Sequence, residues 1–191
     1  MGRHKNTALR RAQIVEGLLT VMATEGYSGA SIQTIARTAE LSPGLLHYHF
    51  GSKQDILIAL LDTLAQRLHE RYSALLPKAD TPWAAVEAWI DAHLALGDAA
   101  DPRAVACWVQ IGAEALCQPE VQHRYAQILQ EDSDVLLRAL RAADIPEPER
   151  AAAGIVAAVQ GAYQLSMAAP SVTPQGTAAG VVRQMAAAFR P

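Results

Sequence analysis

The abundance of alanine is the feature that most constrains how this chain can fold. Alanine occupies 38 of the 191 positions, and it is the best helix former while being depleted in strands. The alternation of Val, Ile and Thr with polar residues that a half-buried strand needs is scarce along the chain. We therefore expect an all-α fold.

Composition and hydropathy narrow the class of protein further. Charged residues make up 18% of the chain and hydrophobic residues 51%, a balance typical of a soluble globular protein and not of a disordered one. No apolar run approaches the roughly 18 residues that a membrane-spanning helix needs. Residues 1–6 lead into an amphipathic helix instead of the apolar core of a signal peptide. We expect a cytoplasmic protein without membrane contact.

The cysteines and histidines do not form a metal-binding pattern. Cys107 and Cys117 are the only cysteines, and their spacing suits neither a disulfide framework nor a zinc site. His47 and His49 lie two apart on an expected helix, where their side chains point about 200 degrees from each other. We expect no metal and no cofactor.

Glycine and proline divide the chain into helical segments. Between these breaks apolar residues recur at helical spacing, with Ser or Pro at several expected starts and Gly at expected ends. The spacing predicts nine helices, over about 7–25, 31–39, 43–50, 52–76, 82–96, 102–117, 119–143, 149–167 and 176–189.

Charge is unevenly distributed along the chain, although the total is only -3. Residues 1–72 carry eight basic side chains against six acidic ones, and the remainder carries eight against thirteen. A positive N-terminal part joined to an acidic body is typical of a DNA-binding head on a domain that does not touch DNA. A basic arm formed by Arg3, Lys5, Arg10 and Arg11 is expected to follow the DNA backbone in a salt-dependent way.

The segments 31–39 and 43–50 have the proportions of a helix-turn-helix. They read SIQTIARTA over 31–39 and LSPGLLHYHF over 41–50, preceded by Gly26-Tyr27 and followed by Ser52-Lys53. This combination resembles the TetR family of bacterial transcriptional regulators, over Ile14 to Leu57, about a quarter of the chain. The resemblance implies a dimeric transcription factor, a repressor that binds an inverted repeat in double-stranded DNA and is released by a small-molecule effector.

Three functional segments follow from this interpretation. We expect a DNA-binding domain over residues 1–50, a long connecting helix over 51–77, and a helical effector-binding and dimerisation domain over 78–191. Two other functions remain open: a DNA-binding regulator without a small-molecule effector, and a small-molecule-modifying enzyme, for which the chain offers no catalytic motif.

The expected DNA contacts gather at helix starts. A recognition helix needs small or polar groups at its start so that its backbone can approach the major groove, and Ser42-Pro43-Gly44 meets that need. The resemblance places Ser42, Pro43, Gly44, Leu45 and His47 toward bases and Tyr48 and His49 toward phosphates. Further phosphate contacts are expected at the starts of two neighbouring helices, from Ser31, Gln33, Thr34 and Lys53.

Two positions depart from the usual pattern. Glu40 stands in the turn where Gly is common, and a left-handed turn there costs a residue other than Gly about 1 kcal/mol. We therefore expect a slightly different turn. Leu45 stands where Thr is frequent, which favours apolar contact with a thymine methyl group.

Aromatic residues of the body predict an effector pocket lined by a few polar groups. A carboxylate at Glu114 beside Trp and Tyr rings would suit a cation, and the run Cys107–Tyr125 resembles the subgroup that contains choline-responsive repressors. The competing interpretation is that these large side chains simply fill the core. The expected lining residues are Trp89, His93, Trp108, Ile111, Glu114, Gln160, Tyr163 and Met167.

Small residues on the penultimate helix and an apolar stripe on the last helix predict a homodimer interface of four helices. Internal packing of the same two helices is the competing interpretation. The expected interface residues are Gly154, Ala158, Gly161, Val181 and Met185.

Overall fold

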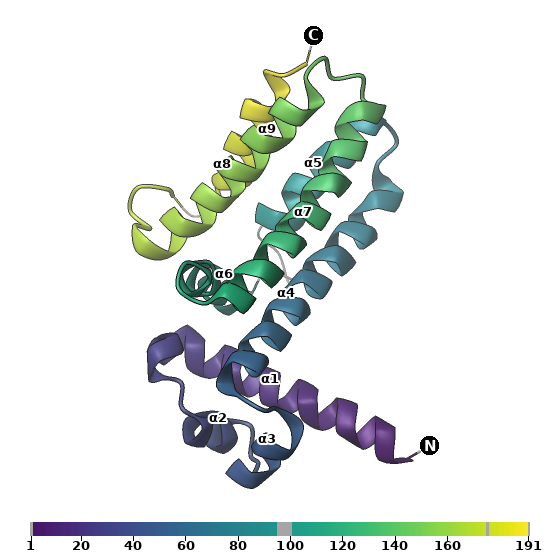
Figure 1. Cartoon of the computed structure of the whole chain (residues 1–191). Coiled ribbons are helices and arrows are strands. Elements are labelled where there is room, and N and C mark those ends of the chain that lie inside the picture. Colours follow the sequence, from purple (N-terminus) through teal and green to yellow (C-terminus); the bar gives the residue numbers. More distant parts are fainter. Residues whose placement is uncertain (1, 95–100, 175, 191) are drawn as a thin grey trace. The chain divides into compact units, whose positions relative to one another are not determined.

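The computed structural model describes the backbone of residues 2–94, 101–174 and 176–190, with side chains from Asn6 onward. Across these ranges it contains nine α-helices, one short 3-10 turn and no strand (Figure 1), which confirms the all-α fold. None of the described helices is long and apolar enough to span a membrane. The elements are α1 (Gly2–Gly29), α2 (Ile32–Thr38), α3 (Pro43–His49), α4 (Lys53–Leu75), the 3-10 turn (Leu76–Lys78), α5 (Pro82–Leu94), α6 (Pro102–Ala115), α7 (Pro119–Ala142), α8 (Pro148–Ala168) and α9 (Ala178–Ala187).

Serine and proline begin the helices where the sequence predicts them. The Ser31 hydroxyl accepts a hydrogen bond from the Thr34 N–H at 3.1 Å, and the Thr34 hydroxyl accepts one from the Ser31 N–H at 2.8 Å, a capping box. Ser42 and Ser52 cap α3 and α4 through the N–H three residues on. Proline is the first residue of α3, α5, α6, α7 and α8, where its missing N–H leaves no helix bond unmade.

Helix α1 differs from the prediction at both ends. It begins at Gly2 instead of about Thr7, and the expected stop at Gly26 is a break inside the helix. Gly26 has φ 73 and ψ 169, a positive φ that residues with a side chain rarely adopt. One further turn, ending at Gly29, follows the break. The end of α5 expected near Leu96 lies outside the described residues.

The chain divides into two compact units. The head unit comprises Met1–Leu64 and Asp101–Tyr125, and the body unit comprises Ala65–Ala100 and Ala126–Pro191. The head unit therefore contains the helix-turn-helix together with α6 and the first turns of α7. The functional boundaries expected at residues 50 and 77 stay predictions.

The core of the head unit forms around α1, which contacts α2, α3 and α6. Gly17 lets α1 approach α2 closely, since a Cβ there would lie 3.0 Å from the Cβ of Ala39. Burial of this apolar set is the main driving force for assembling the unit. The fully buried side chains include Ile14, Leu18, Met22, Ile35, Leu46, Ile56, Leu57, Leu60 and Leu61.

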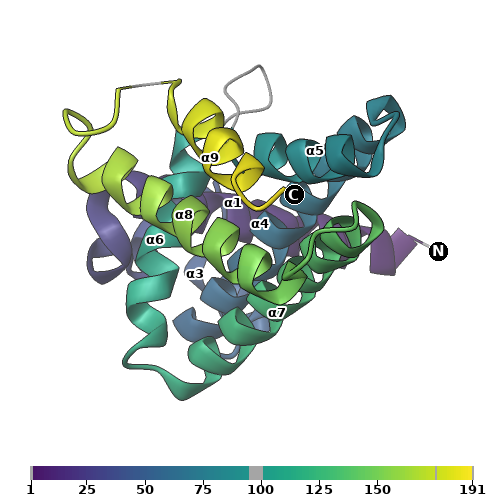
Figure 2. The ribbon, with the colours of Figure 1, turned by 90° about the horizontal axis from the view of Figure 1, so that it is seen from above.

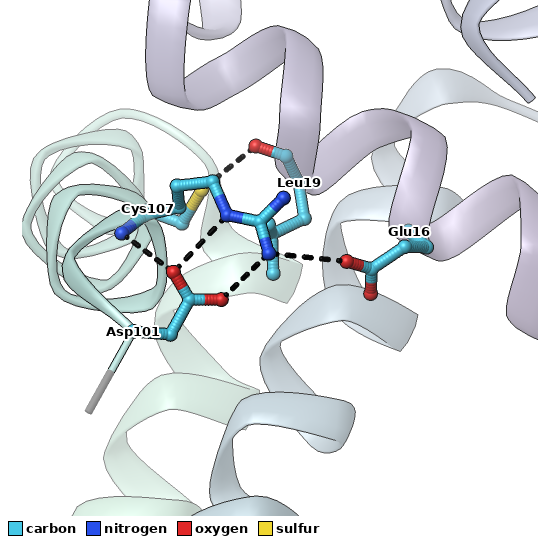
Figure 3. A network of polar contacts seen from close by, with 5 residues as sticks. Glu16, Leu19, Asp101 and Cys107 are labelled. Carbon is cyan, nitrogen blue, oxygen red and sulfur yellow. Dashed lines mark hydrogen bonds and ion pairs between the residues drawn. The ribbon is translucent and has the colours of Figure 1, made fainter. Parts of the chain in front are cut away.

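Polar contacts join the start of α6 to α1 (Figure 3). The Asp101 carboxylate accepts from the Arg103 N–H at 3.0 Å and holds the Arg103 guanidinium through both oxygens at 3.0 and 3.1 Å. The same guanidinium lies 3.7 Å from Glu16 of α1. Cys107 donates to the Leu19 carbonyl at 3.5 Å, and burial, followed by the Asp101 charge, raises the pKa of Cys107 to about 12. Cys107 is therefore a neutral thiol with a packing role.

In the body unit α5 packs against α8 and α9, which lie side by side (Figure 2). Trp89 of α5 is among the largest fully buried side chains. Arg183 of α9 forms an ion pair with Asp91 of α5, and the Arg190 guanidinium lies 5.0 Å from the centre of the Trp83 ring. Charged and cation–π contacts thus border an apolar junction between α5 and α9.

The turn between α2 and α3 contains a residue in the left-handed conformation, Glu40. Glu40 has φ 56, its N–H donates to the Arg37 carbonyl at 3.2 Å, and the Leu41 N–H donates to the Ala36 carbonyl at 2.9 Å. This pair of bonds is the Schellman pattern, in which the left-handed residue is usually Gly. The expectation of a different turn is wrong, because the two backbone bonds hold Glu40 in the strained conformation.

We predict that Glu40→Gly stabilises the protein. Relief of the left-handed strain should raise the free energy of unfolding by about 0.5–1 kcal/mol in urea titrations. Glu40→Ala removes the same charge and keeps the strain, so it should give no such gain. Equal stability of the Gly and Ala variants would contradict the prediction.

Candidate functional site

Helix α3 presents two different faces. Leu46 and Phe50 are buried in the head-unit core, and Leu45 and His49 are half-buried. The opposite face carries only exposed residues, among them Tyr48, whose surface is 69% exposed. The exposed set is Ser42, Pro43, Gly44, His47 and Tyr48.

The start of α3 is open to a close approach from outside. A Cβ at Gly44 would meet no atom within 4 Å, so the backbone itself forms the surface there. Ser42 caps the helix with its hydroxyl oxygen, which positions the first amide groups. A groove-reading helix needs such an unobstructed start.

The neighbouring helix start has the same character. Gln33 is exposed, while Ser31 and Thr34 are half-buried and occupied in the capping box of α2. Their hydroxyl groups therefore order the start of the helix, and the amide groups of its first turn supply donors to an anion.

Arg11 holds the end of α3. Its guanidinium donates to the His49 carbonyl and lies 3.9 Å from the centre of the Phe50 ring. Arg10 donates instead to Gln13 within α1, at 2.9 Å. Of the expected basic arm, Arg11 thus has a positioning role, and the side chains of Arg3 and Lys5 lie outside the described residues.

Lys53, the first residue of α4, is directed at Tyr27. Its Nζ donates to the Tyr27 carbonyl at 3.0 Å and lies 3.9 Å from the centre of the Tyr27 ring. An ammonium group has three N–H donors, so this contact leaves others for a second acceptor. Sequence reasoning expected the phosphate contact at Lys53 but not its anchor.

In the body unit a carboxylate joins two of the expected effector residues, and a third contacts one of these two. The Trp89 indole N–H donates to Asp132 Oδ1 at 3.1 Å, and His93 Nε2 lies 3.0 Å from Asp132 Oδ2. The rings of Trp89 and His93 stack with centres 3.7 Å apart. Tyr163 of α8 donates from its hydroxyl to the His93 carbonyl at 3.1 Å. We call Trp89, His93, Asp132 and Tyr163 the Asp132 cluster.

His93 faces an oxygen with each ring nitrogen. Nδ1 lies 2.7 Å from the Trp89 carbonyl and Nε2 lies 3.0 Å from the Asp132 carboxylate. Both ring nitrogens are therefore engaged by oxygens of the body unit.

Sequence reasoning missed Asp132, although a signal was present. It lies four residues from Ile128 and four from Leu136, both buried on α7, and so it stands on the apolar stripe of the helix. An acid at such a position needs hydrogen-bonding partners inside the fold. The indole and the imidazole supply them.

The other expected effector residues have different local surroundings. Trp108, Ile111 and Glu114 belong to the head unit, where the Trp108 ring lies 5.3 Å from that of Tyr125. Glu114 accepts a hydrogen bond from Gln118, and its charge acts on Tyr27, whose pKa is raised by burial and secondly by that charge. In the body unit Gln160 is half-buried and Met167 is exposed.

The expected interface residues differ in their surroundings. Gly161 faces open space, and Val181 and Met185 are 51% and 55% exposed. A Cβ at Gly154 would lie 3.3 Å from Cζ of the Phe189 ring, so Gly154 accommodates a side chain of its own unit. Ala158 is half-buried.

Across the described residues no group of three His, Cys, Asp or Glu side chains comes close enough to hold a metal ion. Tyr48 and His49 contact each other edge to face, with ring centres 5.1 Å apart, and His47 is exposed.

Comparisons with known proteins agree on one family. The sequence model described as bacterial regulatory proteins, tetR family, matches residues 14–60. The HTH-type transcriptional regulator BetI of Rhizobium meliloti (strain 1021) is 36% identical over 158 residues, which cover 81% of this chain and 76% of that protein. BetI of Agrobacterium fabrum is 29% identical over 159 residues, covering 81% and 75%.

Solved structures share the fold. A transcriptional regulator from Rhodococcus sp. Rha1 has a TM-score of 0.85 at 23% identity, over 94% of this chain and 95% of that one. A transcriptional regulator from Saccharomonospora viridis in complex with choline has a TM-score of 0.79 at 20% identity, over 95% of each chain. The relatives by sequence are regulators and not enzymes, which removes the enzyme alternative.

Proposed function

Because this chain belongs to the tetR family of bacterial regulatory proteins, we propose that it is a dimeric repressor released from its operator by a small cation. The chain is a DNA-binding transcriptional regulator. The proposal adds the residues that contact DNA, the chemistry of the effector and the surface that pairs two copies. It also assigns the protein to the cytoplasm, where bacterial operators lie.

The exposed face of α3 carries the DNA-binding part of the proposal. Small groups at Ser42, Pro43 and Gly44 let the helix start enter the major groove, and Leu45 and His47 follow toward the bases. Tyr48 and His49 then face the phosphates, as do Lys53 and the α2 start with Ser31, Gln33 and Thr34. Leu46 and Phe50 are buried in the head-unit core and anchor α3 there.

The Asp132 cluster supports a cationic effector. Trp89 and His93 are almost fully buried, whereas the Asp132 side chain keeps 24% of its surface exposed. A partly exposed carboxylate at the edge of this aromatic pair attracts a cation by its charge. The choline bound to the Saccharomonospora viridis structure suggests a quaternary ammonium compound.

The same cluster also allows a regulator without an effector. Among the described residues, every buried side-chain nitrogen or oxygen has a hydrogen-bond partner. A cluster satisfied in this way is stable without a ligand. The two interpretations differ in whether a cation binds at Asp132.

We propose that two copies of the chain pair through α8 and α9. Gly161, Val181 and Met185 are each exposed, and Leu165 is 40% exposed, so both helices carry small or apolar residues that lack cover within their own unit. Two copies that bury these residues around a twofold axis form a four-helix interface. Two α3 helices then read half-sites about one DNA turn apart or somewhat more.

Repression and release require two states of the dimer. The effector favours a head spacing that does not match the operator, and a switch from 1:99 to 99:1 needs about 5.5 kcal/mol of differential affinity. Two effector sites in a dimer share this requirement.

We predict that Tyr48→Ala weakens operator binding by about tenfold, equivalent to about 1.4 kcal/mol. The operator is first selected from a random DNA pool with the wild-type protein, and affinity is then measured by fluorescence anisotropy. Leu116→Ala is the control, because Leu116 is exposed in the head unit outside the helix-turn-helix. Failure to select an inverted repeat, together with unchanged binding by the Tyr48 variant, would refute the DNA-binding assignment.

We predict that choline or another quaternary ammonium compound binds in calorimetric titrations, and that Asp132→Asn lowers the affinity by about tenfold or more. The substitution keeps the side-chain shape but removes the negative charge that attracts the cation. Asp134→Asn, on the same helix, should bind like the wild type. Absence of heat with all quaternary ammonium compounds and polyamines would favour a regulator without an effector.

We predict that the wild-type protein sediments as a dimer at micromolar concentration and that Val181→Glu sediments as a monomer. A buried charge in each half of the interface costs more than the apolar contact contributes. Leu116→Glu introduces the same charge elsewhere and should stay dimeric. A monomeric wild type, or a dimeric Val181→Glu variant, would exclude this interface.

A further inference from the structure

The break in α1 leaves a backbone N–H without its helical partner. With φ 73 and ψ 169 at Gly26, the Tyr27 N–H no longer points along the helix to the carbonyl four residues earlier. Gln110 of α6 supplies a new partner. Its Oε1 accepts from the Tyr27 N–H at 3.0 Å and its Nε2 donates to the Met22 carbonyl at 3.0 Å. One amide side chain therefore bridges both sides of the break.

Tyr27 is also the residue that holds Lys53. The Lys53 ammonium donates to the Tyr27 carbonyl at 3.0 Å and lies over the Tyr27 ring at 3.9 Å. The Tyr27 hydroxyl is hydrogen-bonded to Gln118, after the end of α6. Burial, and secondly the Glu114 carboxylate, raise the pKa of Tyr27. Its backbone, ring and hydroxyl are thus all engaged by neighbours within the head unit.

We propose that Gln110 is a positioning residue for DNA binding, which acts on Lys53 through Tyr27. The inference rests on the proposed function, since it assumes that Lys53 binds a phosphate. Gln110 fixes the position of the Tyr27 peptide and ring. Tyr27 then fixes the ammonium at the start of α4, with N–H donors left for a phosphate oxygen. Loss of the Gln110 bonds releases this anchor, and Lys53 then loses its phosphate contact.

Two other contacts between α6 and α1 do not involve Tyr27 or Lys53. Arg103 meets Glu16 of α1, and Cys107 bonds to the Leu19 carbonyl (Figure 3). Loss of the Arg103 contact loosens the same helix pair without touching Tyr27. Arg103 therefore provides a matched control for Gln110.

The test is a double-mutant cycle between Gln110 and Lys53. Gln110→Leu, Lys53→Gln and the double variant are measured against a mixed-sequence duplex of about 30 base pairs over a range of salt concentrations. The mixed sequence suffices because phosphate contacts do not depend on base identity. Thermal unfolding of each variant is recorded in parallel.

The expected result is that Gln110→Leu weakens DNA binding by roughly threefold to tenfold and lowers the salt slope by about one per head. In the Lys53→Gln background the Gln110 substitution should cause no further loss. Arg103→Gln should leave both affinity and slope unchanged. The cycle thus separates an effect through Lys53 from simple loosening of α6.

A second variant keeps the test valid if Gln110→Leu does not fold. Tyr27→Leu retains the backbone bond to Gln110 and removes the ring under the ammonium, so it should show the same Lys53-dependent loss. Equal losses of affinity from the Gln110 substitution in the wild-type and Lys53→Gln backgrounds would overturn the proposal. Full affinity of both the Gln110 and the Tyr27 variants would also overturn it. Unchanged binding by Lys53→Gln also overturns it, whereas the Tyr48 experiment tests the DNA-binding function independently.

Discussion

The burial of α1 is the constraint on which the head unit depends. Ile14, Leu18 and Met22 are completely buried, and α1 contacts α2, α3 and α6 at once. Its apolar stripe therefore sets the positions of both helices of the helix-turn-helix. The Gly26 break then brings the end of α1 to Gln110 and Lys53, so the same helix links the core to the surface proposed to meet DNA.

We expect the net charge of the N-terminal part to contribute little to DNA binding. Residues 1–72 carry eight basic side chains against six acidic ones, and two of these cations are already engaged within the fold, since Arg11 donates to the His49 carbonyl and Lys53 donates to the Tyr27 carbonyl. In the proposed dimer, recognition depends on the shape of the α3 face, on helix starts and on two heads acting together.

In the body unit, the carboxylate of Asp132 lies on an apolar helix face. Asp132 is tolerated because an indole and an imidazole donate to it, and Tyr163 secures the carbonyl of that histidine. The local sequence of α7 shows an acid on the buried stripe but not its partners. Those come from α5, which is distant in the sequence, and only packing brings them together.

Local sequence is sufficient for the all-α fold, the capped starts of α2, α3 and α4, and the helix-turn-helix, because caps, breaks and helical periodicity act over a few residues. It is not sufficient to show that Gly26 breaks α1 instead of ending it, or that Glu40 stays left-handed. Packing alone establishes that Lys53 rests on Tyr27, that Gly154 receives Phe189 and that Asp132 accepts from Trp89. Each of these depends on contacts between residues far apart in the chain, whose geometry local propensity does not encode.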